Sequence, residues 1–216
     1  MGSDGLLLAD IGNSRIHIYH NQKVKHLLPD DAIEDYGKEG IFYISVNQGL
    51  EKRLQQETLW KNISGQIHLP NEYETMGVDR KALCLSYESG VFVDVGSAIT
   101  VDVMEHGIYK GGYIFPGLKA MLESYKRISS ALDVSLVEHV DITQLPLTTK
   151  EQISYGIIAS IKTLIEKISD KKRLYFTGGD GKYLAGFFRD GIYDEALVFK
   201  GMKHALKASK QINNQQ

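Results

Sequence analysis

The sequence predicts an α/β protein made of two halves, each built on a mixed β-sheet with helices. One observation is a repeat: an apolar run ending in Asp-x-Gly occurs at Leu7–Ser14 and again at Phe92–Ala98, about 84 residues later. Another is that strand-like stretches joined by a turn follow each copy, and then alternating helical and strand patterns. A third is that 43% of the 216 residues are hydrophobic, enough for a sizeable core. We expect halves at residues 1–89 and 90–216.

The first half is interpreted from the spacing of its apolar residues. Alternating positions predict strands, three- or four-residue spacings predict helices, and Gly or Asn pairs mark turns. The Asp-x-Gly strand is therefore followed by a strand over Arg15–His20, a turn at Asn21-Gln22 and a strand from Lys23. The elements expected next are a helix over Asp31–Tyr36, a strand over Ile41–Val46, a polar surface helix over Gly49–Trp60, a strand and loop over Ile63–Glu74, and a helix over Asp79–Glu88.

The second half repeats the hairpin and then becomes mainly helical. Strands are expected over Ile99–Met104 and from Ile108, with a turn at His106-Gly107. Asp and Gly are the only identical core residues of the two copies, so chance similarity between two hairpins is the alternative to duplication. The elements expected after the hairpin are helices over Leu118–Ile128 and Ile153–Ile168, a strand over Leu174–Thr177, a helix over Lys182–Phe188, a strand over Ala196–Phe199, a helix over Gly201–Ala208, and a fraying tail from Lys210.

Composition argues against several classes of function. The net charge is −2 and no basic run exceeds Lys171–Arg173, so we expect neither nucleic acid nor an anionic membrane as a partner. No apolar run approaches the ~20 residues that span a bilayer, and we expect no signal peptide. The single cysteine, Cys84, lies in an apolar stretch and is expected to be a buried thiol. A cytoplasmic enzyme or binding protein is the expectation.

The repeated Asp-x-Gly turn has the chemistry of a phosphate cradle. Glycine lets the chain turn sharply, so that backbone N–H groups approach a phosphate closely, and the small residues Asn13 and Ser14 add side-chain donors. Two facing copies would form a nucleotide clamp. A plain β-turn is the alternative for either copy taken alone.

Five motifs follow one another along the chain. They are Asp10-x-Gly12-Asn13-Ser14, Gly77-Val78-Asp79-Arg80, Asp94-x-Gly96-Ser97-Ala98-Ile99-Thr100-x-Asp102, Gly111-Gly112-x-x-x-Pro116-Gly117 and Thr177-Gly178-Gly179. In this order the sequence resembles the type III pantothenate kinases over nearly its whole length. The resemblance implies the fold of the acetate and sugar kinase, heat-shock chaperone and actin superfamily, in which two ribonuclease-H-like halves bind ATP in the cleft between them. It also implies transfer of the ATP γ-phosphoryl group to pantothenate, which gives 4′-phosphopantothenate in the first step of coenzyme A biosynthesis.

The resemblance assigns the nucleotide and cation contacts to the two turns. Asp10 is expected to hold a hydrated Mg²⁺, and Ser97 is a nucleotide contact. Asp94 maps to the position for a monovalent cation, K⁺ or NH₄⁺, since a carboxylate with carbonyls and water suits a hard cation. The residues of the phosphate cradle are Asp10, Ile11, Gly12, Asn13, Ser14, Arg15, Ile16 and His17.

The same resemblance places pantothenate near Gly77–Arg80. Asp79 is the candidate general base, and Arg80 is the candidate partner of the pantothenate carboxylate, because guanidinium pairs bidentately with planar anions. The alternatives are a capping carboxylate for Asp79, a surface ion pair for Arg80, and a loop aromatic over the core for Tyr73. The substrate contacts that the resemblance implies are Tyr73, Gly77, Val78, Asp79, Arg80 and Thr149. A homodimer with pantothenate pockets at or near its interface is implied as well.

Departures from the family pattern are mild. Ser14 and Ser97 stand where threonine is commoner, and each keeps the hydroxyl. Two other functions stay open, because fold alone does not fix a substrate. They are another small-molecule kinase of the superfamily, which Gly77-Val78-Asp79-Arg80 argues against, and a regulatory relative without turnover, which the intact carboxylates argue against.

Overall fold

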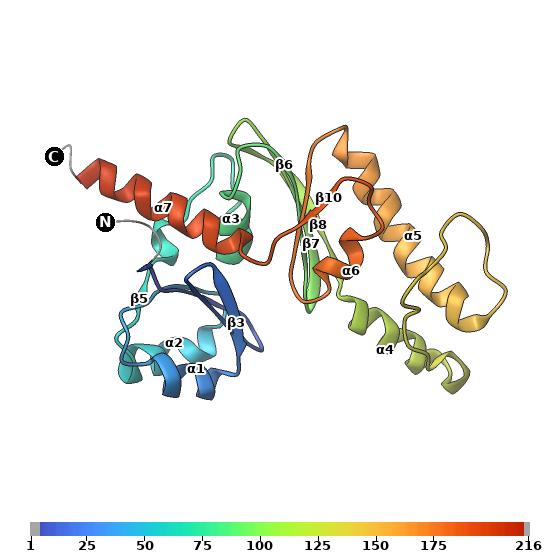
Figure 1. The fold of residues 1–216 in the computed structure, drawn as a ribbon, viewed down its shortest axis with the longest axis horizontal. Coiled ribbons are helices and arrows are strands. Elements are labelled where there is room, and N and C mark those ends of the chain that lie inside the picture. The colour runs from blue at the N-terminus through green and yellow to red at the C-terminus, as the bar shows by residue number, and fades with distance from the viewer. Residues whose placement is uncertain (1–4, 214–216) are drawn as a thin grey trace. The chain divides into compact units, whose positions relative to one another are not determined.

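The computed structural model describes residues 5–213 and divides them into two compact units (Figure 1). The first unit holds the chain up to Glu88, the short segment Met104–Lys110, and the chain from Glu195 onward. The second unit holds Ser89–Val103 and Gly111–Asp194. The first change of unit therefore lies beside the expected boundary at 89/90. The segments Met104–Lys110 and 195–213, which we expected in the second half, belong instead to the first unit.

The first unit contains a five-stranded mixed sheet in the order β3-β2-β1-β4-β5. Its central strand β1 pairs antiparallel with β2 and parallel with β4, so the carboxyl ends of β1 and β4 meet at one edge. Two helices, α1 and α2, bury Ala32, Ile33 and Leu54 in the core of this sheet. The strands and helices named here are β1 (Leu8–Ile11), β2 (Ile16–His20), β3 (Lys23–Leu27), α1 (Pro29–Tyr36), β4 (Phe42–Ser45), α2 (Gln48–Glu57) and β5 (Lys61–Asn62).

The second sheet repeats the same topology. Its order is β10-β9-β6-β7-β8, and its central strand β6 pairs parallel with β9 as β1 does with β4. Asp10 and Asp94 both stand one residue before the end of their central strand. This equivalence supports duplication over chance similarity. The end of β7 and the start of β8, within Met104–Lys110, belong to the first unit. The strands of this sheet and the helices of the second unit are β6 (Gly90–Val95), β7 (Ala98–Glu105), β8 (Ile108–Pro116), α4 (Leu118–Ile128), η3 (Ser130–Leu132), α5 (Thr149–Ser169), β9 (Leu174–Thr177), α6 (Gly181–Ala185) and β10 (Gly191–Tyr193).

Two helices of the first unit, α3 (Val78–Cys84) and α7 (Leu197–Asn213), pack directly against each other. The crossing is so close that a Cβ atom at Gly201 of α7 would overlap the carbonyl oxygen of Ala82 in α3. Cys84 is buried in this region as predicted. Because α3 carries Asp79 and Arg80, its contact with α7 helps to hold these two candidate residues in place.

Two predicted strands are wrong. Ala196–Phe199 is not a strand, because Leu197 begins helix α7. Leu197, Val198 and Phe199 are all buried, and a short continuous apolar run has no period that separates strand from helix. The stretch Ile63–Glu74 contains no strand either: the two-residue β5 precedes it, and a 3₁₀ turn, η2 (Ser64–Gln66), opens it.

Other differences concern element ends. Helix α2 ends at Glu57, three residues before the expected end at Trp60, because Thr58 takes an extended conformation. Helix α3 ends at Cys84 and not at Glu88. Strand β10 was missed, and α7 continues through Asn213 where we expected fraying. Both predicted hairpin turns are confirmed, because the two central residues of each turn have the positive φ angles typical of tight hairpins. They are Asn21, Gln22, His106 and Gly107. Within residues 5–213, no helix has the length and apolarity needed to cross a membrane.

Candidate active site

The first Asp-x-Gly turn follows directly from strand β1. The Gly12 N–H donates to the Arg15 carbonyl oxygen at 3.0 Å, which closes the turn before β2 begins. Asn13, Ser14 and Arg15 are exposed at its tip, and Asp10 is partly buried on the strand below. Ile11 and Ile16, both predicted as nucleotide contacts, are fully buried, so only their backbone faces this turn. The polar side chains that this turn can offer to a ligand are therefore those of its exposed tip and of Asp10.

His17 lies opposite Asp10 in the β1–β2 register and contacts a second histidine. Its Nδ1 is 2.6 Å from Nδ1 of His26, so one ring must carry its proton there while the other accepts. Burial, followed by the neighbouring His26 and Arg15, lowers the pKa of His17 to about 4. His17 is therefore neutral at pH 7 and brings no positive charge to the cradle.

Asn47, which the sequence analysis did not single out, links the Gly12–Arg15 turn to the end of strand β4. Its Nδ2 donates to the carbonyl oxygens of Gly12 at 3.4 Å and Asn13 at 3.3 Å. Its Oδ1 accepts from the Leu50 N–H at 3.3 Å and so caps helix α2. The sequence signal was present as a capping residue just after a strand, but its second set of contacts spans 34 and 35 residues of chain.

Asp79 is the second residue of α3 and stands directly over Gly77. A Cβ atom at position 77 would lie 2.5 Å from Asp79 Oδ1, so the glycine is required for the carboxylate to take this place. Asp79 Oδ1 also accepts from the Arg80 N–H at 2.8 Å. The carboxylate is only partly buried, which leaves it accessible to a small substrate. This placement agrees with both a helix-start carboxylate and a general base.

Arg80 is only 7% exposed, so the alternative of a surface ion pair is wrong. Its Nη1 donates to the Tyr73 hydroxyl at 2.5 Å and its Nη2 to the Tyr109 hydroxyl at 3.5 Å. The rings of Tyr73 and Tyr109 lie 6.2 Å apart. The structure thus brings together Tyr73 and Arg80, two of the residues expected to contact the substrate. Tyr109, on β8, was missed because 29 residues separate it from Arg80.

Helix α3 also holds the loop that carries Tyr73. Lys81 Nζ lies 2.8 Å from Oε1 of Glu72, and both side chains are largely buried. Asn71 Nδ2 donates to the Tyr109 carbonyl oxygen at 2.9 Å, and the Tyr109 N–H donates to Pro70. These contacts fix the loop on both sides of Tyr73, so the aromatic ring is positioned by its neighbours although it is itself exposed.

In the second unit, Asp94 lies beside the glycine of the Thr177-Gly178-Gly179 motif. Gly178 has a φ of +86°, which favours glycine, and a Cβ atom there would overlap Asp94 Oδ1 and approach the Val95 carbonyl oxygen to 2.6 Å. A carboxylate and a carbonyl oxygen therefore converge at this glycine. Asp94 also pairs with Thr177 in the β6–β9 register. The motif therefore needs a glycine at position 178, because a side chain there would collide with Asp94.

Gly117 plays the matching role beside Ser97. Its N–H donates to the Ser97 carbonyl oxygen at 3.0 Å, and a Cβ atom at this position would lie 2.6 Å from the same oxygen. Ser97 is exposed at the tip of the second Asp-x-Gly turn. The Gly111–Gly117 and Thr177–Gly179 motifs, distant in sequence, therefore both pack against the turn from Asp94 to Ser97.

Thr149, the remaining predicted substrate contact, is the exposed first residue of α5 in the second unit. The cap of this helix is its neighbour Thr148, whose Oγ1 accepts from the Glu151 N–H at 3.4 Å. Thr149 and Asp94 thus belong to one unit, and Asp10, Asp79 and Arg80 to the other.

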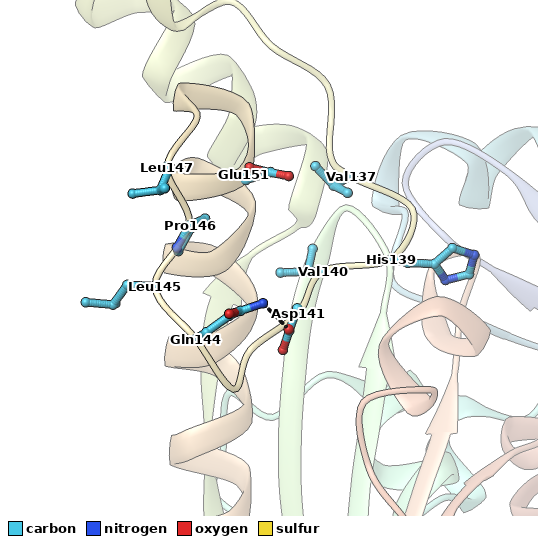
Figure 2. Close-up of a pocket in the computed structure, with 9 residues that line it drawn as sticks. All are labelled: Val137, His139, Val140, Asp141, Gln144, Leu145, Pro146, Leu147 and Glu151. Atoms are coloured by element: carbon cyan, nitrogen blue, oxygen red, sulfur yellow. Dashed lines mark hydrogen bonds between the residues drawn. The ribbon is translucent and has the colours of Figure 1, made fainter.

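A hollow of about 290 Å³ lies between the loop over residues 137–147 and the start of α5 (Figure 2). Two of its lining residues are hydrogen-bonded, with Gln144 Nε2 donating to Asp141 Oδ2 at 2.8 Å. None of the predicted catalytic, nucleotide or substrate residues lines it. The residues that line the hollow are Val137, His139, Val140, Asp141, Gln144, Leu145, Pro146, Leu147 and Glu151.

Comparison with known proteins identifies the family. The family model for type III pantothenate kinase matches residues 42–171. A type III pantothenate kinase from Helicobacter hepaticus is 43% identical over 208 residues, which cover 96% of this chain and 100% of that protein. A crystal structure from Campylobacter jejuni, which carries the name of a Baf family transcriptional activator, is 37% identical with a TM-score of 0.86, covering 95% of this chain and 100% of that one.

A more distant structure shares the fold alone. The activator of 2-hydroxyisocaproyl-CoA dehydratase from Clostridium difficile, solved with bound ADPNP, is 10% identical with a TM-score of 0.53, covering 95% of this chain and 97% of that one. Together with the two sheets of equal topology, this likeness confirms the predicted class of two ribonuclease-H-like halves. The matches in sequence cover nearly all of this chain at well over a third identity. The chain therefore belongs to the type III pantothenate kinase family.

Proposed function

We propose that this protein is an ATP-dependent kinase that phosphorylates the primary hydroxyl of pantothenate, giving 4′-phosphopantothenate in the first step of coenzyme A biosynthesis. The observation that carries the proposal is the pairing, on one short helix, of an accessible Asp79 carboxylate with a buried Arg80 guanidinium held by tyrosines. One group can accept a proton and the other can bind an anion. A substrate that has a hydroxyl and a carboxylate matches both, and the chain's family supplies its name.

In this proposal Asp79 acts as general base on the attacking hydroxyl, and Arg80 pairs with the pantothenate carboxylate. Tyr73 holds one edge of the guanidinium and contacts the substrate. Gly77 and Val78 approach the substrate through their backbone, since a side chain at 77 would collide with Asp79. Thr149 supplies a hydroxyl from the exposed start of α5.

The nucleotide phosphates are proposed to bind at the exposed tip of the Gly12–Arg15 turn, with Ser97 as a further nucleotide contact. Asp10 offers carboxylate oxygens at the base of that turn, which suits Mg²⁺ with its preference for oxygen ligands and retained water. Mg²⁺ would neutralise charge on the polyphosphate when bound. The protein's own contribution is the backbone N–H groups of the turn and the donors of Asn13 and Ser14.

A coupled assay of ADP release, run with and without pantothenate, tests the proposal. ADP release that requires pantothenate supports it. Release that requires a sugar or acetate instead would point to another kinase of the superfamily. Nucleotide binding without any turnover would point to the regulatory alternative.

Activity is expected to depend on K⁺ or NH₄⁺, with Na⁺ a poor substitute. The supporting observation is the convergence of Asp94 Oδ1 and the Val95 carbonyl oxygen beside Gly178, a donor set that suits a hard cation. Asp94→Ala should abolish the cation dependence together with most of the activity, whereas Asp31→Ala, at an exposed carboxylate of α1, should preserve both. Equal rates in K⁺ and Na⁺ at matched ionic strength would refute the cation site.

A cytoplasmic homodimer completes the proposal. The second unit keeps several large apolar side chains exposed, including Ile128 at the end of α4 (73%) and Leu164 on α5 (41%). Such side chains on the two helices give a partner an apolar surface. Light scattering at micromolar concentration should report about twice the 24.2 kDa of one chain, and dissociation should weaken pantothenate binding more than nucleotide binding. A fully active monomer would contradict the dimer and its role in the pocket.

A further inference from the structure

We propose that Asn47 is a positioning residue that orients the backbone N–H groups of the phosphate turn toward the nucleotide. The proposal rests on the function proposed above, since it takes the Gly12–Arg15 turn as the phosphate site. It is carried by the contacts of one side chain that uses both ends of its amide.

The donor end of Asn47 holds two consecutive carbonyl groups. Nδ2 lies 3.4 Å from the Gly12 oxygen and 3.3 Å from the Asn13 oxygen, while Oδ1 lies 3.3 Å from the Leu50 nitrogen. Acceptors on one side and a donor on the other determine which way the amide points. Its donors therefore go to the turn, and its oxygen goes to helix α2.

The chain around Asn47 is itself fixed to the same edge of the sheet. Val46 N–H donates to the Ile11 carbonyl oxygen at 3.1 Å, continuing the β1–β4 pairing past the end of both strands. Asn47 N–H donates to Ser45 Oγ at 3.1 Å, and Ser45 N–H donates to Ser64 Oγ at 3.2 Å. The side chain that holds the turn is thus anchored through its own backbone.

Peptide planarity converts these two contacts into an orientation of the turn. In a trans peptide the C=O of one residue and the N–H of the next point in opposite directions. The Gly12 carbonyl shares its plane with the Asn13 N–H, and the Asn13 carbonyl shares its plane with the Ser14 N–H. By holding both carbonyls on its own side, Asn47 directs the N–H groups of Asn13 and Ser14 away from itself, where a phosphate can accept from them.

Two substitutions separate this role from capping. Asn47→Asp keeps an oxygen for the Leu50 N–H but loses the donors and sets a carboxylate against two carbonyls. Asn47→Ser also keeps a good capping oxygen, but its shorter side chain cannot extend to the turn. Gln48→Glu is the matched control, because it adds the same charge at the exposed first residue of α2 without contacting the turn.

The experiment measures steady-state kinetics, direct titration of each variant with ADP and with an ATP analogue, and thermal unfolding. Both Asn47 variants are expected to raise the KM for ATP and weaken ADP binding by about tenfold, the effect of losing two hydrogen bonds at about threefold each. The KM for pantothenate and the Tm should stay near the wild-type values. Gln48→Glu should behave as the wild type.

Three results would overturn the proposal. One is ATP KM and ADP affinity within twofold of wild type in both Asn47 variants. Another is an equal rise in both KM values together with a lowered Tm, which would reduce Asn47 to a structural cap. The third is the same loss in Gln48→Glu, which would assign the effect to charge. Failure of the proposed function appears separately, as a wild-type protein that releases no pantothenate-dependent ADP.

Discussion

Replacing Asp79 with asparagine is expected to lower turnover by ~10²–10⁴-fold, the usual cost of removing a general base. The amide keeps the shape of the carboxylate and retains Oδ1 as acceptor for the Arg80 N–H, so the fold of α3 should persist. What it loses is the ability to take the proton of the attacking hydroxyl. Pantothenate should still bind, because Arg80 and its tyrosine partners are unchanged.

The measurement is turnover at saturating substrates under conditions where chemistry limits the rate, with calorimetric titration of pantothenate alongside. Asp31→Asn, at an exposed position of α1, controls for loss of one negative charge. A variant that kept more than about a tenth of the wild-type turnover would remove Asp79 from the role of base, since general-base catalysis contributes at least ~10²-fold. Loss of pantothenate binding in the variant would instead give Asp79 a binding role.

Gly201→Ala is expected to destabilise the protein by about 3 kcal/mol, the upper part of the usual range for overpacking. The added methyl group would overlap the backbone carbonyl of Ala82 and lie 3.2 Å from Cβ of Leu85. A backbone carbonyl in a helix cannot rotate away as a side chain can, so α3 and α7 must separate. Because α3 carries Asp79 and Arg80, activity should fall at lower temperatures than in the wild type.

Urea and thermal unfolding measure the effect, and Gly156→Ala is its matched control. Gly156 is an exposed helical glycine in α5 whose Cβ would meet only the Tyr125 hydroxyl, at 4.0 Å. Alanine there should stabilise by ~0.5–1 kcal/mol, because it lowers the backbone entropy lost on folding. Equal stability of Gly201→Ala and the wild type would show that α7 does not cross α3 at this close distance.

The sequence was sufficient where a local pattern determines local structure. The Asp-x-Gly strands and their hairpins were predicted because alternation and turn residues act over a few neighbouring positions. Ala196–Phe199 was mispredicted because Leu197, Val198 and Phe199 are buried together, and burial on all sides removes the period on which such a prediction depends. In the structure these residues begin helix α7, which packs against α3, a segment more than a hundred residues away.

The candidate site also combines contacts within one motif with contacts between distant segments. Asp79 and Gly77 are two residues apart, so one motif contained both the carboxylate and the glycine that makes room for it. Neither Asn47 nor Tyr109 shares a motif with its partner in the site, since Gly12 and Arg80 are 35 and 29 residues away. Residues that position a site can lie far from it in the sequence, and only the folded structure shows their contacts. The candidate catalytic residues, in contrast, lie within short sequence motifs.

The return of the chain to the first unit at Glu195 has a consequence for synthesis on the ribosome. Strands β1 to β5 and helix α3 emerge early, but α7, which covers α3 and buries Leu197 and Met202, is translated after every strand and helix of the second unit. The first unit to begin is therefore the last to be finished. Until then the nascent chain exposes the apolar face of α3, so chaperone protection is needed longest at the segment that carries Asp79.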